Sequence, residues 1–163
     1  MGPGPFACDL VPSFITMEFK ELPSNVYAEQ SIIGSMLIDQ TLCNTMIKLV
    51  KPEYFYLFAH QVIVSAIIEM SKVNEIIDPI TVAEKLQTDV SLMNAGGMVY
   101  LSQLVSFASM PANLESHTKI IKEKYLRREL HKLLLDTSEK IFEDISVEEI
   151  INTVNKKLSQ LPH

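Results

Sequence analysis

The chain has little cysteine, and the two it has, Cys8 and Cys43, share no motif or repeated spacing. A disulfide framework needs cysteines in pairs, and a zinc site needs cysteines or histidines at short, fixed intervals. None of the four histidines stands at such an interval from another histidine or from a cysteine. The sequence therefore predicts neither a disulfide scaffold nor a metal site, and it favours a reducing, cytoplasmic compartment.

Glycine is also scarce, and its placement excludes a phosphate-binding loop. Such a loop is a glycine-rich turn followed by lysine and then serine or threonine. None of the five glycines precedes a lysine in this way. No serine, cysteine or histidine stands in a known nucleophile motif either. We therefore expect no catalytic residue and no bound cofactor in this chain.

Two further absences limit the possible partners. No apolar run approaches the ~20 residues of a membrane span. Basic residues are outnumbered, with 14 lysines and arginines against 20 acidic residues, so the formal net charge is −6. A protein that holds DNA by its phosphates should be basic, so we expect single-stranded DNA contacts to be weak or indirect. Protein partners are favoured over a membrane or a nucleic acid.

Helical periodicity dominates what is present. Apolar residues recur at helical spacing in five short stretches between residues 23 and 112, whereas sustained strand alternation and hairpin turns are missing. Residues 1–22 lack this periodicity, and we interpret them as an added leader or a flexible tail. The sequence predicts an all-α protein whose residues 23–112 form a globular bundle of about five short helices.

Residues 113–161 predict an αα-hairpin. Asn113 should cap a helix that continues to about Phe142, and Ser146 with Glu149 should form a capping box for the final helix. The long helix carries apolar residues on two flanks, although packing against one partner helix needs only one. We therefore expect the hairpin to be an oligomerisation element. The predicted interface residues are Leu126, Leu130, Leu133, Ile141, Val154 and Leu158.

The first helix, from about Val26 to Ile38, contains Gly34, which costs about 1 kcal/mol relative to alanine at such a position. Either a second helix packs there too closely for a Cβ, or the glycine is merely tolerated. The spacing predicts an apolar face on this helix and a polar face that carries Glu29, Gln30 and Ser35.

Two polar features have two interpretations each. His60 is either a core histidine whose ring satisfies a buried group, which we favour, or a functional contact. Lys124, Arg127 and Arg128 lie on the long helix among other basic residues and alternate with glutamates. They either contact nucleic-acid phosphates or form a solvated face with ion pairs one turn apart. The acidic chain and the lack of an aromatic ladder favour the solvated face.

Five motifs, in this order, resemble the N-terminal domain of DnaB-type replicative helicases. They are Pro23 with Ala28-Glu29-Gln30 and Ile33-Gly34-Ser35-Met36-Leu37, Phe55-Tyr56 with His60, Asp78-Pro79-Ile80-Thr81-Val82, Gly96-Gly97 with Tyr100-Leu101, and Asn113 with Lys119-Ile120-Ile121-Lys122-Glu123-Lys124 and Arg127-Arg128. His117 departs from the pattern, because an aromatic residue is commoner there.

The resemblance implies the collar domain of a replicative DNA helicase. In that family the hairpins pair into dimers, and three dimers form a ring above a hexameric ATPase. The collar helps to recruit the primase DnaG and, in some members, meets the helicase loader. ATP and Mg²⁺ would then bind a motor domain of the parent protein and not this chain. The alternative is a free-standing helical adaptor or regulatory protein with no helicase attached.

Overall fold

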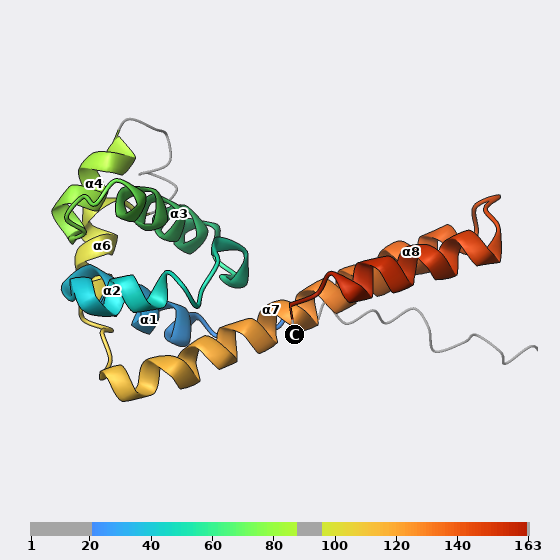
Figure 1. The fold of residues 1–163 in the computed structure, drawn as a ribbon, viewed down its shortest axis with the longest axis horizontal. Coiled ribbons are helices and arrows are strands. Elements are labelled where there is room, and N and C mark those ends of the chain that lie inside the picture. Colours follow the sequence, from blue (N-terminus) through green and yellow to red (C-terminus); the bar gives the residue numbers. More distant parts are fainter. Residues whose placement is uncertain (1–20, 88–95, 163) are drawn as a thin grey trace, which may run out of the picture.

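The computed structural model describes residues 21–87 and 96–162, and every regular element within these ranges is a helix. The first five α-helices of this part form a globule, and the last two extend from it as a long arm (Figure 1). The predicted fold class, an all-α bundle followed by an αα-hairpin, is confirmed. The predicted leader, residues 1–22, lies outside the described residues up to residue 20.

Helix α1 (Val26–Ile38) forms the centre of the globule. The side chain of Asn25 caps it by accepting a hydrogen bond from the backbone N–H of Ala28 at 3.0 Å. The polar face predicted for this helix was wrong for Glu29 and Ser35, because both side chains are buried. Helices α6 and α7 pack against α1 as well as α2 and α3, so neighbours surround it on nearly all sides.

The other elements of the globule follow in chain order around α1. They are α2 (Gln40–Met46), the 3₁₀ turn η1 (Pro52–Tyr54), α3 (Phe58–Lys72), α4 (Pro79–Gln87) and α6 (Gly97–Val105). Asp39 and Asp78 cap α2 and α4, since each carboxylate accepts two backbone N–H groups of the following turn. These aspartate caps explain why the two helices begin where they do.

The core of the globule joins α1, α3 and α6. Its fully buried apolar side chains include Ile32, Ile33, Met36, Phe55, Ile63, Ile67, Met70, Leu101 and Leu104. Full burial of a side chain of this kind contributes about 1.5–3 kcal/mol to folding. This core therefore stabilises the globule from which the arm extends.

Helix α7 (Pro111–Lys140) runs from the globule into the arm. It begins at Pro111, two residues before the predicted cap Asn113, because proline fits the first position of a helix, where no N–H is needed. Its first half packs on α1 and buries Leu114, Thr118 and Ile121. Its second half leaves the globule (Figure 1).

Helix α8 (Val147–Ser159) folds back along the second half of α7. The hydroxyl oxygen of Ser146 accepts a hydrogen bond from the backbone N–H of Glu149 at 3.2 Å, so the predicted N-cap is confirmed. Lys157 of α8 donates a hydrogen bond to Asp136 of α7 at 2.9 Å. Over the described ranges, no helix combines the length and the apolar character needed to cross a bilayer.

Candidate functional site

The arm exposes large apolar side chains to solvent. Leu134 is 61% exposed and Val147 is 72% exposed, although each lies in or beside a helix that has a partner helix. Helical spacing places six of these side chains on one flank of each helix. They are Leu130, Leu134 and Ile141 of α7 and its C-terminal end, and Val147, Ile151 and Leu158 of α8.

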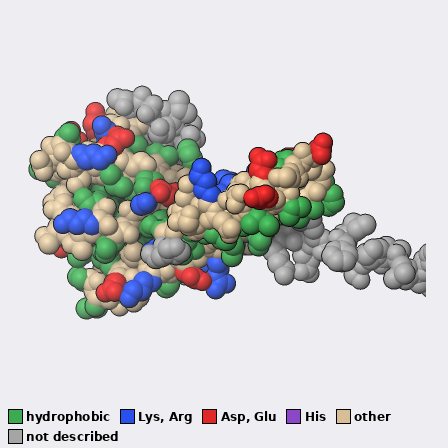
Figure 2. Space-filling model, turned by 45° about the vertical axis from the view of Figure 1, so that its right-hand side comes forward, with side chains coloured by type: hydrophobic (Ala, Val, Ile, Leu, Met, Phe, Trp, Pro, Cys, Tyr) green, Lys and Arg blue, Asp and Glu red, His purple; other side chains and the backbone are tan. Residues whose placement is uncertain are grey.

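We call these six residues the hairpin face. Because α7 and α8 run in opposite directions, the two flanks open on the same side of the arm. Hydrophobic side chains gather along one edge of the arm in the space-filling view (Figure 2). The arm therefore presents a continuous apolar surface that residues 21–87 and 96–162 leave exposed.

Three of the six predicted interface residues, Leu130, Ile141 and Leu158, belong to the hairpin face. Leu126 and Val154 are half-buried. Leu133 is only 6% exposed, because it lines the seam between α7 and α8 together with Leu161. Leu133 therefore stabilises the hairpin itself, and its side chain is not exposed for contact with another subunit. That the remaining residues contact another subunit stays a prediction.

Sequence reasoning missed Leu134, Val147 and Ile151 as interface candidates. Leu134 lies one turn after Leu130, so the spacing alone could have included it. Val147 and Ile151 lie on the apolar stripe of the final helix, from which only Val154 and Leu158 were predicted to reach the interface. In the structure the stripe extends beyond the contact with α7, and both residues are exposed.

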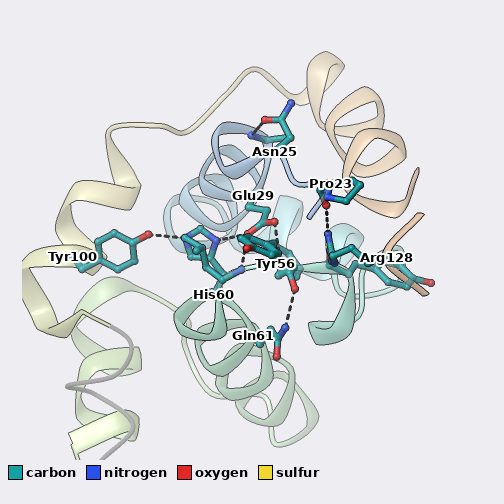
Figure 3. A network of polar contacts seen from close by, with 12 residues as sticks. Pro23, Asn25, Glu29, Tyr56, His60, Gln61, Tyr100 and Arg128 are labelled. Carbon is teal, nitrogen blue, oxygen red and sulfur yellow. Dashed lines mark hydrogen bonds and ion pairs between the residues drawn. The ribbon is translucent and has the colours of Figure 1, made fainter. Parts of the chain in front are cut away.

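A polar cluster lies inside the globule. At its centre, His60 of α3 is fully buried between α1 and α6 (Figure 3). Its Nδ1 lies 2.6 Å from the Glu29 carboxylate, and its Nε2 lies 2.6 Å from the Tyr100 hydroxyl. Because a carboxylate only accepts, the proton belongs on Nδ1, and Nε2 accepts from Tyr100. Burial, assisted by the charge of Glu29, raises the pKa of Tyr100, so this hydroxyl keeps its proton.

Glu29 also organises the loop between η1 and α3. Its carboxylate accepts hydrogen bonds from the backbone N–H groups of Tyr56, at 2.8 Å, and Leu57, at 3.5 Å. His60 thus has the role that the sequence favoured, a core histidine that satisfies a buried group. Sequence reasoning missed Glu29 as its partner, although Glu29 and His60 both belong to the motifs that carry the family resemblance.

Arg128 connects the arm to the globule. Its Nη1 donates to the carbonyl oxygen of Pro23 at 2.8 Å, and its Nη2 donates to that of Tyr54 at 2.9 Å. Its guanidinium also lies over the rings of Tyr56, at 5.5 Å, and Tyr125, at 6.0 Å. Burial lowers the pKa of Arg128, but an arginine stays charged near neutral pH. Arg128 therefore has a structural role within the single chain.

Two other basic residues of α7 belong to a solvated face of the helix. Arg127 pairs with Glu123 at 2.8 Å, and Lys119 pairs with Glu115 at 2.7 Å, each one turn apart on exposed parts of the helix. Such pairs satisfy the charges locally and contribute little to stability. Phosphate contacts by Lys124, Arg127 and Arg128, considered from the sequence, stay predictions.

Gly34 lies where α1 meets the C-terminal end of α6. A Cβ at this position would collide with the backbone carbonyl oxygen of Leu104 and would lie 3.0 Å from the backbone nitrogen of Ala108. Both obstacles are main-chain atoms, which cannot turn aside as a side chain can. The close approach of two backbones accounts for a glycine inside a buried helix.

Within residues 21–87 and 96–162, no three histidine, cysteine or acidic side chains are grouped so that they could hold a metal ion. Two features of this part of the chain stand out: the exposed hairpin face, and the contact by which Arg128 joins the arm to the globule.

Comparisons with known proteins agree with this geometry. The family model described as the DnaB-like helicase N terminal domain matches residues 21–123. The chain is 37% identical to the replicative DNA helicase DnaB of Rhodothermus marinus, over 69% of this chain and 12% of that protein. It is 34% identical to a probable replicative DNA helicase of Trieres chinensis, over 87% of this chain and 31% of that protein. The chain thus spans about a third or less of these relatives.

Solved structures show the same fold. The N-terminal domain of DnaB helicase from Mycobacterium tuberculosis superimposes with a TM-score of 0.78 at 28% identity, over 85% of this chain and 99% of that chain. A DnaB-like replicative helicase, described with its interactions with primase, gives a TM-score of 0.67 at 21% identity, over 85% of this chain and 32% of that chain. This second likeness is one of fold.

Proposed function

Because this chain belongs to the family of DnaB-like helicase N-terminal domains, we propose that it is the collar through which a replicative DNA helicase assembles. In this proposal the collar holds subunits together and offers a docking platform, while a motor domain elsewhere in the parent protein performs the unwinding. The relatives are about three times longer or more, which supports a larger parent protein over a free-standing adaptor.

The observation that carries the proposal is the hairpin face. Its apolar side chains are exposed in the single chain, and covering them would release free energy of about 25 cal/mol per Å² of apolar area. Identical chains most often satisfy such a surface by twofold pairing, in which the same patch is buried on both copies. We propose that two hairpins pair through this face and that three such dimers complete a hexameric ring.

The single chain is also proposed to be inactive as an enzyme. Its five glycines form no phosphate-binding loop, so ATP and Mg²⁺ would bind the motor domain of the parent. Primase is the proposed protein partner, supported by the DnaB-like helicase of the same fold that is described with its interactions with primase. A helicase loader is a further proposed partner.

Sedimentation equilibrium of the purified chain, from about 1 to about 100 μM, tests the proposal. We expect masses that rise with concentration to a dimer and to even multiples of the mass of one chain. In a separate ATPase assay, we expect no ATP turnover at any concentration of the chain. A strictly monomeric chain across this range would contradict the proposed assembly. An ATPase activity that co-purifies with the chain would contradict the proposal that ATP is hydrolysed only in the motor domain of the parent.

A further inference from the structure

Helix α7 belongs to two parts of the molecule at once. Leu114 and Ile121 are buried against the globule, whereas the residues beyond them extend into the arm. Arg128 lies two turns beyond Ile121, about 10 Å further along the helix axis. It is therefore placed where the arm separates from the globule and where a small tilt would be amplified toward the tip.

Arg128 enters a socket made by two segments that are distant in sequence. The carbonyl oxygen of Pro23 comes from the entry to α1, and the carbonyl oxygen of Tyr54 comes from η1. The ring of Tyr56 closes the socket beneath the guanidinium. A planar guanidinium that donates to two carbonyls fixes direction as well as distance, which a lysine ammonium cannot do.

Hydrogen bonds from the core of the globule also hold the socket in place. Glu29 fixes the backbone N–H of Tyr56, and Gln61 donates to the carbonyl oxygen of Phe55 at 2.8 Å. His60 ties Glu29 to Tyr100 on α6, so the loop that carries the socket is bonded to α1 and α3 and, through His60, to α6 (Figure 3). The socket that binds Arg128 is therefore rigid relative to the core.

We propose that Arg128 is the joint that sets the direction of the arm relative to the globule. The joint is a property of the single chain and does not depend on the proposed assembly, although it would decide where the hairpin face is presented. Lys140 lies about 18 Å beyond Arg128 along α7, so a tilt of about ten degrees at the joint would move the tip by about 3 Å.

Distance measurements between two spin labels test the joint. One label is placed at Asn44 on α2 and the other at Glu143 near the tip, since both positions are exposed. Cys8 is replaced by serine. Cys43 is buried, and burial raises the pKa of its thiol to about 11, so it stays unlabelled in the folded chain. Labelled protein is diluted with excess unlabelled protein, so that only distances within one chain are recorded.

Arg128→Lys keeps the charge and removes the planar fork. The matched control is Arg127→Lys, because Arg127 is the neighbouring arginine but pairs, among the described residues, with Glu123 on the exposed side of the helix. Circular dichroism verifies that both variants keep the helical content of the wild type.

We expect Arg128→Lys to shift or broaden the distance distribution by about 3 Å or more, while Arg127→Lys matches the wild type. A distribution for Arg128→Lys that matches the wild type would overturn the proposal. So would an equal change in both variants, because the effect would then be general to the helix. Loss of helical content in Arg128→Lys would also overturn it, since Arg128 would then support the fold as a whole.

Discussion

The imidazole Nδ1 of His60 lies 2.6 Å from Oε2 of Glu29, and both side chains are shielded from solvent. The pair connects α3 to α1 inside a core that is otherwise mostly apolar. Each group satisfies the other, so removing either one leaves a buried polar partner without its hydrogen bond. That loss costs more than the bond itself contributes.

Glu29→Gln tests this dependence. The amide keeps the shape of the side chain but removes the charge and one acceptor, so we expect the free energy of unfolding to fall by about 1.5–3 kcal/mol. Urea denaturation followed by circular dichroism measures it. The matched control is Glu115→Gln on the exposed face of α7, which should leave the free energy of unfolding nearly unchanged. Equal stability of Glu29→Gln and the wild type would show that the buried carboxylate is dispensable.

Gly34→Ala tests the contact between α1 and α6. Alanine is the better helix former by about 1 kcal/mol, but its Cβ would meet the backbone at Leu104. We expect a net loss of roughly 1–3 kcal/mol, seen as a lower midpoint of thermal unfolding. Ser102→Ala, at an exposed position on α6, is the control and should be near neutral. A raised midpoint for Gly34→Ala would mean that the two helices separate without cost.

Much of the fold could be predicted because its signals are local. Asp39, Asp78 and Ser146 cap the helices that follow them through atoms two or three residues away. Gly34 could also be singled out, since a glycine inside an apolar helix needs a reason. Patterns of this kind are carried by neighbours in the sequence, so they survive without knowledge of the tertiary structure.

The errors arose where a partner is distant in sequence. Glu29 was assigned to a solvent-facing side because nothing nearby indicates that His60 covers it. Arg128 looked like one more charge on a basic helix, yet its acceptor on Pro23 is 105 residues away. Leu133 and Leu134 are adjacent, but one is buried and the other exposed. The way α8 is turned against α7 decides this, and periodicity alone does not reveal it.

The hairpin should weaken in acid. Lys157 donates a hydrogen bond to Asp136 and lowers the pKa of that carboxyl below its ordinary value. A carboxyl whose pKa is lower in the folded state stabilises the fold above its ordinary pKa. That contribution is lost as pH falls through the lowered value. We therefore expect Asp136→Asn to lower the thermal midpoint near neutral pH.

The difference between Asp136→Asn and the wild type should shrink progressively below about pH 3.9. Thermal melts at a series of pH values measure it. Asp144→Asn, at an exposed position between the two helices, is the control and should track the wild type at every pH. A difference between Asp136→Asn and the wild type that stays constant into acid would show that the effect does not depend on the charge of Asp136.

Self-association through the hairpin face is the central claim, and light scattering on Leu134→Asp with Ile151→Asp tests it most directly. Both side chains are exposed in the single chain, so the variant should keep its helical circular dichroism. Leu133 is left unchanged because it is buried within the hairpin. His131→Asp with Asn152→Asp adds one acidic residue to each helix at exposed positions off the hairpin face and serves as the control. We predict that the wild type and the control keep an oligomeric mass while the face variant falls to the mass of one chain. A face variant that keeps the mass of the wild type would contradict the account.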